Sequence, residues 1–221
     1  MEEYRRPTIP VEIYRDALGT PIDYGNRWGG AGAPVDAYSR VSNRQRFAPL
    51  HAVAMALIEW LQVTFDVTLE QGPSVASDFL RMPHEVISAV RVVPREPAAA
   101  PLTFVLTQFP GVSLHAGLLH DFQFPGCGCD ACDDDATGVA EELEWTVRTV
   151  VSGGYSERFD PWPGRWFEYR IDEPGTRMHS GRSRSSGLPQ GRMKSARAAL
   201  PPAGQWSPWQ LLPQSVADAA D

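Results

Sequence analysis

The fold of this chain is decided by residues 102–118, which read LTFVLTQFPGVSLHAGL. In both halves of this stretch, apolar residues alternate with polar or small ones, which is the period of two of a β-strand. The Pro110-Gly111 pair between the halves is typical of a tight turn. The stretch therefore predicts a β-hairpin of two antiparallel strands, at 102–109 and 112–118.

Further elements on both sides of the hairpin complete an α+β pattern. Strands are predicted at 66–69, 86–93 and 166–171 from β-branched or alternating residues. Helices are predicted at 47–64 and 137–152, because each range carries one apolar stripe at helical spacing. Strands joined by a hairpin imply a mainly antiparallel sheet, and amphipathic helices need a sheet face on which to bury their stripes. We therefore expect a two-layer α+β sandwich with a sheet of about four to five strands and two main helices.

The predicted elements divide the chain into three parts. Residues 1–46 are interrupted by proline and glycine and are expected to be irregular, whereas residues 47–172 hold the α+β core. Residues 173–221 contain six prolines and five glycines without a sustained hydrophobic period. This low-complexity, basic tail is predicted to be disordered or loosely held.

The charge pattern bears on partners. The net charge of the chain is -7, which argues against nucleic acid as a partner because the whole molecule repels phosphate backbones. Residues 177–197 contain no acidic residue, whereas residues 96–147 contain no Lys or Arg. We hypothesise an intramolecular contact between the basic tail and the acidic surface, with two separately solvated charge runs as the alternative.

The sequence also indicates a compartment. No run approaches the roughly 20 apolar residues that span a bilayer, and the charged N-terminus lacks the apolar centre of a signal peptide. The chain has only three cysteines, all in one loop, so they do not form the disulfide framework of a secreted protein. We therefore expect a cytoplasmic protein that does not bind a membrane.

That loop is the most distinctive chemical feature of the sequence, and residues 124–133 read FPGCGCDACD. Thiolates so close together repel one another unless a cation neutralises them. The pair Cys129 and Cys132 has the Cys-x-x-Cys spacing that suits tetrahedral Zn²⁺, and Gly128 gives the backbone the freedom to bring Cys127 to the same ion. The sequence thus predicts a zinc site, and the alternative is a tight turn in which small cysteines pack together.

The fourth ligand decides what such a site does. His120 is the nearest imidazole and the first candidate, with His115, an Asp or a water as alternatives. A closed site is structural, and our leading interpretation is a binding or accessory domain with a metal-stabilised cysteine loop. An open position instead indicates a zinc-dependent, hydrolase-like enzyme with Asp121, His115 or His120 as general base. A thiol redox protein is the third hypothesis, because a Cys-x-x-Cys pair near a helix N-terminus has a lowered thiol pKa.

A second feature is a loop near the N-terminus that concentrates hydrogen-bond donors, a guanidinium and two aromatic rings. Such a loop is a candidate lining for a ligand pocket. The alternative is aromatic packing that fixes the irregular N-terminal segment to the core. The candidate pocket residues are Asp23, Tyr24, Asn26, Arg27, Trp28 and His115.

Four runs of the sequence carry a resemblance to a known family. Residues 23–28, 46–51, 114–117 and 127–133 are similar to a family of actinobacterial proteins catalogued as a domain of unknown function. The run Cys-Gly-Cys-Asp-Ala-Cys is its most specific part, although members carry Glu soon after the last Cys, where this chain has Asp134. The resemblance covers residues 5–171 and implies a bacterial, cytosolic origin. It brings no activity, substrate or cofactor.

Overall fold

The computed structural model describes residues 3–160, 166–184, 188 and 190–213. Its larger sheet has five strands in the order β1-β2-β3-β4-β5, each antiparallel to its neighbour. These strands are β1 (Val67–Gln71), β2 (Val86–Pro94), β3 (Leu102–Thr107), β4 (Val112–Ala116) and β5 (His120–Phe124). The predicted hairpin is confirmed as β3 and β4, and its register pairs Phe104 with Leu114.

The chain reverses sharply between β4 and β5, because Gly117 takes a φ of 63°, which favours glycine. A Cβ atom at this position would lie 2.2 Å from Oε2 of Glu157. The buried Glu157 carboxylate accepts hydrogen bonds from the backbone N–H groups of Leu118 and Leu119, at 3.0 and 2.7 Å. The strand predicted at 112–118 therefore ends at Ala116, and β5, which the sequence pattern did not predict, follows it.

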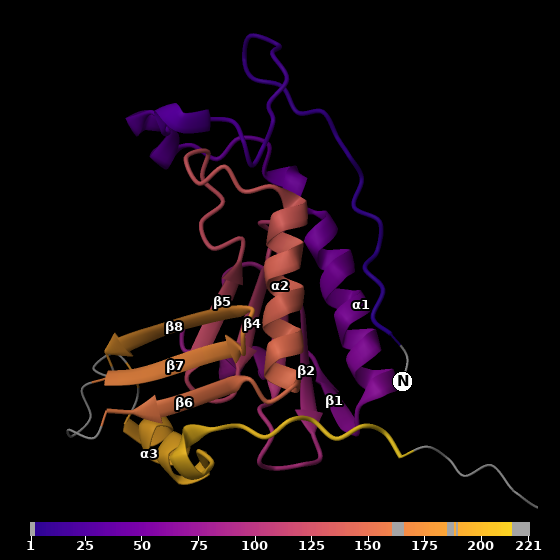
Figure 1. Cartoon of the computed structure of the whole chain (residues 1–221), viewed down its shortest axis with the longest axis vertical. Coiled ribbons are helices and arrows are strands. Elements are labelled where there is room, and N and C mark those ends of the chain that lie inside the picture. Colours follow the sequence, from indigo (N-terminus) through magenta and orange to yellow (C-terminus); the bar gives the residue numbers. More distant parts are fainter. Residues whose placement is uncertain (1–2, 161–165, 185–187, 189, 214–221) are drawn as a thin grey trace, which may run out of the picture.

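Two amphipathic helices cover one face of the larger sheet, as the sequence predicted. They are α1 (Pro49–Thr64) and α2 (Ala136–Val151), and Figure 1 shows them side by side in front of the strands. The carboxylate of Asp135 caps α2 by accepting hydrogen bonds from the N–H groups of Thr137 and Gly138, at 2.8 and 2.9 Å. The predicted stripes are buried: Leu50, Val53, Ala54, Leu57, Ile58 and Leu61 on α1, and Val139, Leu143, Val147 and Val150 on α2.

A second antiparallel sheet of three strands corrects the expectation of a single sheet. It contains β6 (Tyr155–Phe159), β7 (Trp166–Glu173) and β8 (Arg177–Arg184), in that order. The strand predicted at 166–171 is β7, but it pairs within this smaller sheet. The residues of β8 are almost all exposed and lack apolar alternation. Pairing with β7, rather than a local pattern, makes this segment a strand.

The expectation that residues 173–221 are disordered is wrong for the described part of this tail. After β8 the chain forms α3 (Gln190–Ala199), and residues 205–212 then lie extended against the core. The indole N–H groups of two buried residues, Trp206 and Trp209, donate to the Glu157 carboxylate at 3.0 Å and to the Ala100 carbonyl at 2.9 Å. Two tryptophans bury enough apolar area to anchor a segment that has no periodic pattern. Residues 161–165, 185–187, 189 and 214–221 lie outside the described residues.

Among the described residues, one ion pair joins the basic tail to the acidic helix α2. Arg177 of β8 forms an ion pair with Glu142 of α2, and its guanidinium lies 4.2 Å from the centre of the Trp145 ring. A wider contact between the tail and the acidic surface stays a prediction.

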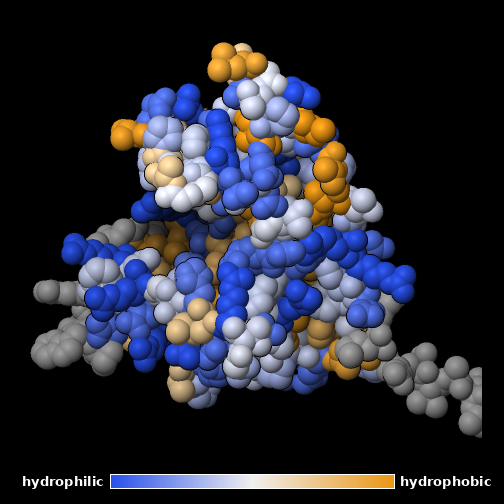
Figure 2. All heavy atoms as spheres, turned by 45° about the horizontal axis from the view of Figure 1, so that its top comes forward, coloured by the Kyte–Doolittle hydropathy of each residue, from blue (hydrophilic) through white to orange (hydrophobic). Residues whose placement is uncertain are grey.

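The N-terminal segment forms short 3₁₀ helices at Gly29–Ala31, Val35–Ser39 and Arg44–Phe47. The large apolar side chains that this segment exposes include Val11, Ile13, Leu18 and Val35. Figure 2 shows several separate apolar groups on the surface of this part of the molecule. One helical stretch, Arg44–Thr64, is long and apolar enough to cross a membrane by length and composition, and 44% of its most apolar window is buried. The core helix of a compact fold meets the same criterion, so this stretch is weak evidence for a membrane span.

Candidate metal centre

The three cysteines converge in the loop between β5 and α2. The Sγ atoms of Cys127, Cys129 and Cys132 all lie within 4.8 Å of one another, and those of Cys129 and Cys132 are 3.5 Å apart. Three thiolates at about 2.3 Å from one tetrahedral zinc ion are roughly 3.8 Å apart. The 3.5 Å between Cys129 and Cys132 is close to this value, and the upper limit of 4.8 Å for the group lies about 1 Å above it. Cys129 is buried, whereas Cys127 and Cys132 are exposed, so one side of the cluster faces solvent.

Hydrogen bonds among the three thiols and from the backbone favour the thiolate form of Cys129. A hydrogen bond from the Cys127 thiol, followed by backbone N–H groups of Cys132 and Ala131, lowers the pKa of Cys129. The hydrogen bond with Cys129 is the main cause that raises the pKa of Cys132 to about 12. These opposite shifts favour a thiolate at Cys129 beside a protonated Cys132, and a divalent cation would be needed to stabilise three thiolates.

A buried carboxylate fixes the middle of the loop. Asp130 accepts hydrogen bonds from the backbone N–H and the hydroxyl of Ser42, at 2.7 and 2.8 Å, and lies 3.6 Å from a guanidinium nitrogen of Arg27. Burial by itself would raise the pKa of Asp130, but the two Ser42 donors, Arg27 and Arg46 hold it below its usual range. The charged form of Asp130 therefore ties the loop to the N-terminal segment.

A buried arginine fixes both ends of the loop. The Arg46 guanidinium donates to the backbone carbonyls of Gly128 and Asp134, at 3.3 and 3.0 Å, and is 3% exposed. Its guanidinium carbon lies 4.1 Å from the centre of the Tyr24 ring and 4.1 Å from the centre of the Phe47 ring. Sequence reasoning missed its role, and the only signal was its place in the run 46–51 that carries the family resemblance.

The N-terminal loop that was a candidate pocket lining packs on the cysteine loop, and Asp23 and Tyr24 also line a pocket of about 210 Å³. The Trp28 indole donates to the Asp130 carbonyl at 2.9 Å, and the Arg27 backbone N–H donates to the Asp133 carboxylate at 2.7 Å. Tyr24 lies against Arg46, whereas Asp23 and Asn26 are exposed. These contacts fit the packing alternative, and a ligand in the pocket stays a prediction.

The histidines are not brought to the cysteines. Among the described residues, the group of side chains close enough to share one ion consists of the three cysteines. The His120 ring stacks on Tyr169 with the ring centres 3.5 Å apart, and burial lowers its pKa to about 3. The Nδ1 atom of His115 lies 2.6 Å from Oδ1 of Asp121, whose Oδ2 accepts the Leu80 backbone N–H at 2.9 Å. His115 is thus held in a cross-strand pair on the sheet.

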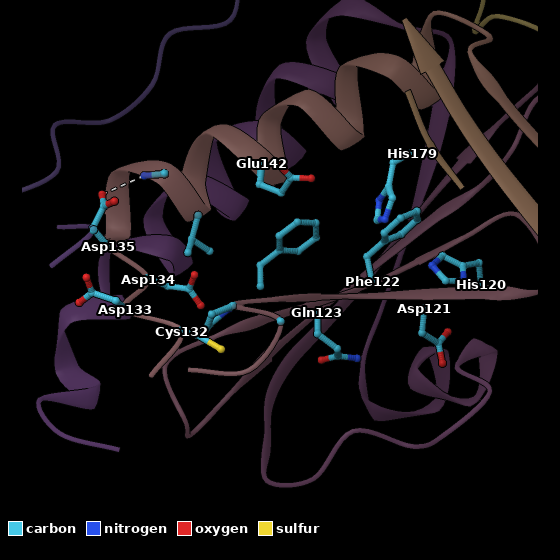
Figure 3. Close-up of a pocket in the computed structure, with 16 residues that line it drawn as sticks. His120, Asp121, Phe122, Gln123, Cys132, Asp133, Asp134, Asp135, Glu142 and His179 are labelled. Atoms are coloured by element: carbon cyan, nitrogen blue, oxygen red, sulfur yellow. Dashed lines mark hydrogen bonds between the residues drawn. The ribbon is translucent and has the colours of Figure 1, made fainter. Parts of the chain in front are cut away.

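A pocket of about 570 Å³ lies beside the cluster, between the cysteine loop, the start of α2, β5 and β8. Figure 3 shows Cys132 and Asp134 at one end of it and His120 and His179 at the other. Its described lining includes carboxylates and imidazoles but no Lys or Arg. Burial raises the pKa of Asp134. The site therefore combines three thiols with a neighbouring pocket that disfavours anions.

Comparison with known proteins gives one result. Residues 10–213 match the model of a protein family that is described as a family of unknown function. This match extends through β8, α3 and the segment that contains Trp209, so the expectation that the likeness ends at residue 171 is wrong. No curated protein and no solved structure matches the chain.

Proposed function

Because the chain belongs to this family of unknown function (DUF6226), which passes on no activity, we propose from the site alone that the protein is a zinc-binding domain. Cys127, Cys129 and Cys132 are the protein ligands of the ion. The observation that carries the proposal is the convergence of three Sγ atoms within 4.8 Å in one loop. Three free thiols also fit a reducing compartment, and we place the protein in the cytoplasm.

The primary role that we propose for the metal is structural. The loop connects the N-terminal segment, β5 and α2, and buried charges of Asp130 and Arg46 already hold its backbone. A bound ion would replace the repulsion among three thiolates by metal–sulfur bonds and would lock this junction. The protein then serves as a binding or accessory domain.

Elemental analysis of anaerobically purified protein tests this proposal. We expect about one zinc per chain in the native protein, loss of the metal in Cys129→Ser, and retention in Ala131→Ser, which alters the same loop but keeps all three thiols. Replacement by Co²⁺ should give thiolate-to-metal charge-transfer absorption. A metal-free native protein whose three thiols all react freely would refute the proposal, and a Cys129–Cys132 disulfide in that protein would favour the thiol redox hypothesis.

A second candidate function rests on the pocket beside Cys132. Three thiolates leave the fourth position of a tetrahedral ion to a water or an external ligand, as a hydrolase-like zinc enzyme requires. His120 and Asp121 line the pocket and are the candidate bases, although both carboxylate oxygens of Asp121 already accept hydrogen bonds.

The cobalt form separates the two roles. Imidazole added to the Co²⁺ protein should change its visible spectrum if the fourth position is open to solvent. It should leave the spectrum unchanged if the chain closes the site.

A further inference from the structure

The outer face of the smaller sheet carries a second concentration of chemistry, separate from the cysteine loop. Along β6, β7 and β8, alternate residues face away from the core, and the strand register places them in two transverse rows. One row contains Ser156, Arg170 and Ser180, and the next contains Arg158, Glu168 and Arg182. Three arginines from three adjacent strands thus occupy neighbouring positions.

These residues line a hollow in the surface. Its volume is about 400 Å³, which lies within the range of small-molecule sites. Besides the two rows, the lining includes Gly181 and Gln205. The hydroxyls, the amide and the guanidinium groups are hydrogen-bond donors, and Glu168 is the one carboxylate among the lining residues.

The positive charges of this hollow are only partly neutralised. Arg158 pairs with Glu168 at 2.6 Å, and Arg170 pairs with Asp172 at 2.7 Å. Arg182 instead lies over the Trp166 ring, with its guanidinium carbon 5.0 Å from the ring centre. Within the part of the chain that the structure describes, Arg182 forms no ion pair with a carboxylate.

We propose that this hollow binds a small anion that carries two or more phosphoryl groups. Guanidinium groups match phosphoryl oxygens in geometry and charge, and serine hydroxyls add neutral donors. Arg158 and Arg182 lie on strands separated by β7, so their backbones are roughly 10 Å apart. A chain of phosphoryl groups can bridge the guanidinium groups of Arg158 and Arg182 across this distance better than a single phosphate can.

The ligand is small rather than a nucleic acid strand. The net charge of the whole chain is -7, and long polyanions extend beyond the basic patch onto the acidic remainder of the surface. A compact polyphosphate stays inside the patch. Inorganic tripolyphosphate and a nucleoside triphosphate share this chemistry.

Calorimetric titration of the full-length, metal-replete protein tests the inference with tripolyphosphate, adenosine triphosphate and a single-stranded oligonucleotide as probes. We expect Arg182→Gln to weaken tripolyphosphate binding roughly ten-fold. Glu168→Gln removes the lining carboxylate and frees Arg158, and should strengthen binding about three-fold. Arg95→Gln, which removes an exposed arginine directly after β2 that pairs with Asp66, should change it by less than roughly two-fold.

The strengthening by Glu168→Gln distinguishes a binding site from a damaged fold, because misfolding does not raise affinity. Tighter binding of adenosine triphosphate than of tripolyphosphate would identify a nucleotide as the ligand, and the reverse would identify an inorganic polyphosphate. Failure of both to bind, an equal loss in Arg95→Gln, or tightest binding of the oligonucleotide would overturn the inference. Cys129→Ser should retain this binding, so its outcome is independent of the metal site.

Discussion

The half-buried imidazole of His120 makes the stability of this protein depend on pH in a calculable way. Burial against Tyr169 and Phe122 lowers its pKa to about 3 in the folded state, although Asp121 opposes the shift and His115 and His179 add to it. An unfolded histidine has a pKa of about 6.5. Between these values the unfolded chain binds a proton that the folded chain does not.

The sign and size of the effect follow from linkage. Lowering the pH from about 7 to about 5 stabilises the unfolded state by roughly 2 kcal/mol through this one group, since the folded imidazole stays neutral at both values. The stability contributed by neutral His120 is therefore present above about pH 6.5 and declines as the pH falls toward about 3.

Urea unfolding at the two pH values measures the effect as a difference between proteins. Wild type should lose roughly 2 kcal/mol more than His120→Gln, which cannot titrate at this position. His84→Gln removes an exposed histidine and supplies the matched control. If wild type and His120→Gln lose the same stability to within about 0.5 kcal/mol, the lowered pKa of the His120 ring is refuted.

Three further substitutions test the packing around the site and the tail, each by urea unfolding. Trp209→Ala should destabilise the fold by about 3–5 kcal/mol, and a loss below about 1 kcal/mol would show that the C-terminal segment is not part of the core. Asp130→Asn should cost about 1.5–3 kcal/mol, because Ser42 then loses a charged acceptor, and it should also weaken zinc retention. An unchanged metal content in Asp130→Asn would show that Asp130 supports the fold but not the binding of the metal. Gly128→Ala should cost about 1–3 kcal/mol, since φ is 76° and a Cβ atom would lie 2.8 Å from Cζ of Phe109; an equally stable variant would mean that the loop relaxes freely.

Chelation provides an independent measure of the metal. At a free zinc concentration about 100-fold above its dissociation constant, binding stabilises the folded state by roughly 2.7 kcal/mol. For a chain of this size the melting temperature should fall by roughly 5–11 °C when zinc is removed. Cys129→Ser should melt at the same temperature with and without chelator.

Some of the structure was readable from local pattern. The alternation in residues 102–118 predicted β3 and β4, and the apolar stripes predicted α1 and α2 almost to the residue. Each of these elements buries one face, so the spacing of its apolar residues by itself shows whether the segment is a helix or a strand.

Other elements carry no such signal. β8 is exposed on nearly all of its residues, and β5 was hidden because its strand begins only four residues after β4 ends. The role of the C-terminal segment depends on Trp206 and Trp209, whose partners Glu157 and Ala100 lie far away in the sequence. No window of the sequence contains both members of such pairs.

The candidate site divides in the same way. The nearness of Cys127, Cys129 and Cys132 was determined by the sequence alone, because thiols within six residues can meet wherever a flexible loop allows it. Only the tertiary structure decided what surrounds them: Arg46 and Asp130 secure the loop, and His120 turns to Tyr169 rather than to sulfur. Contacts within one loop are set by chain connectivity, whereas contacts between distant segments depend on how the whole core packs.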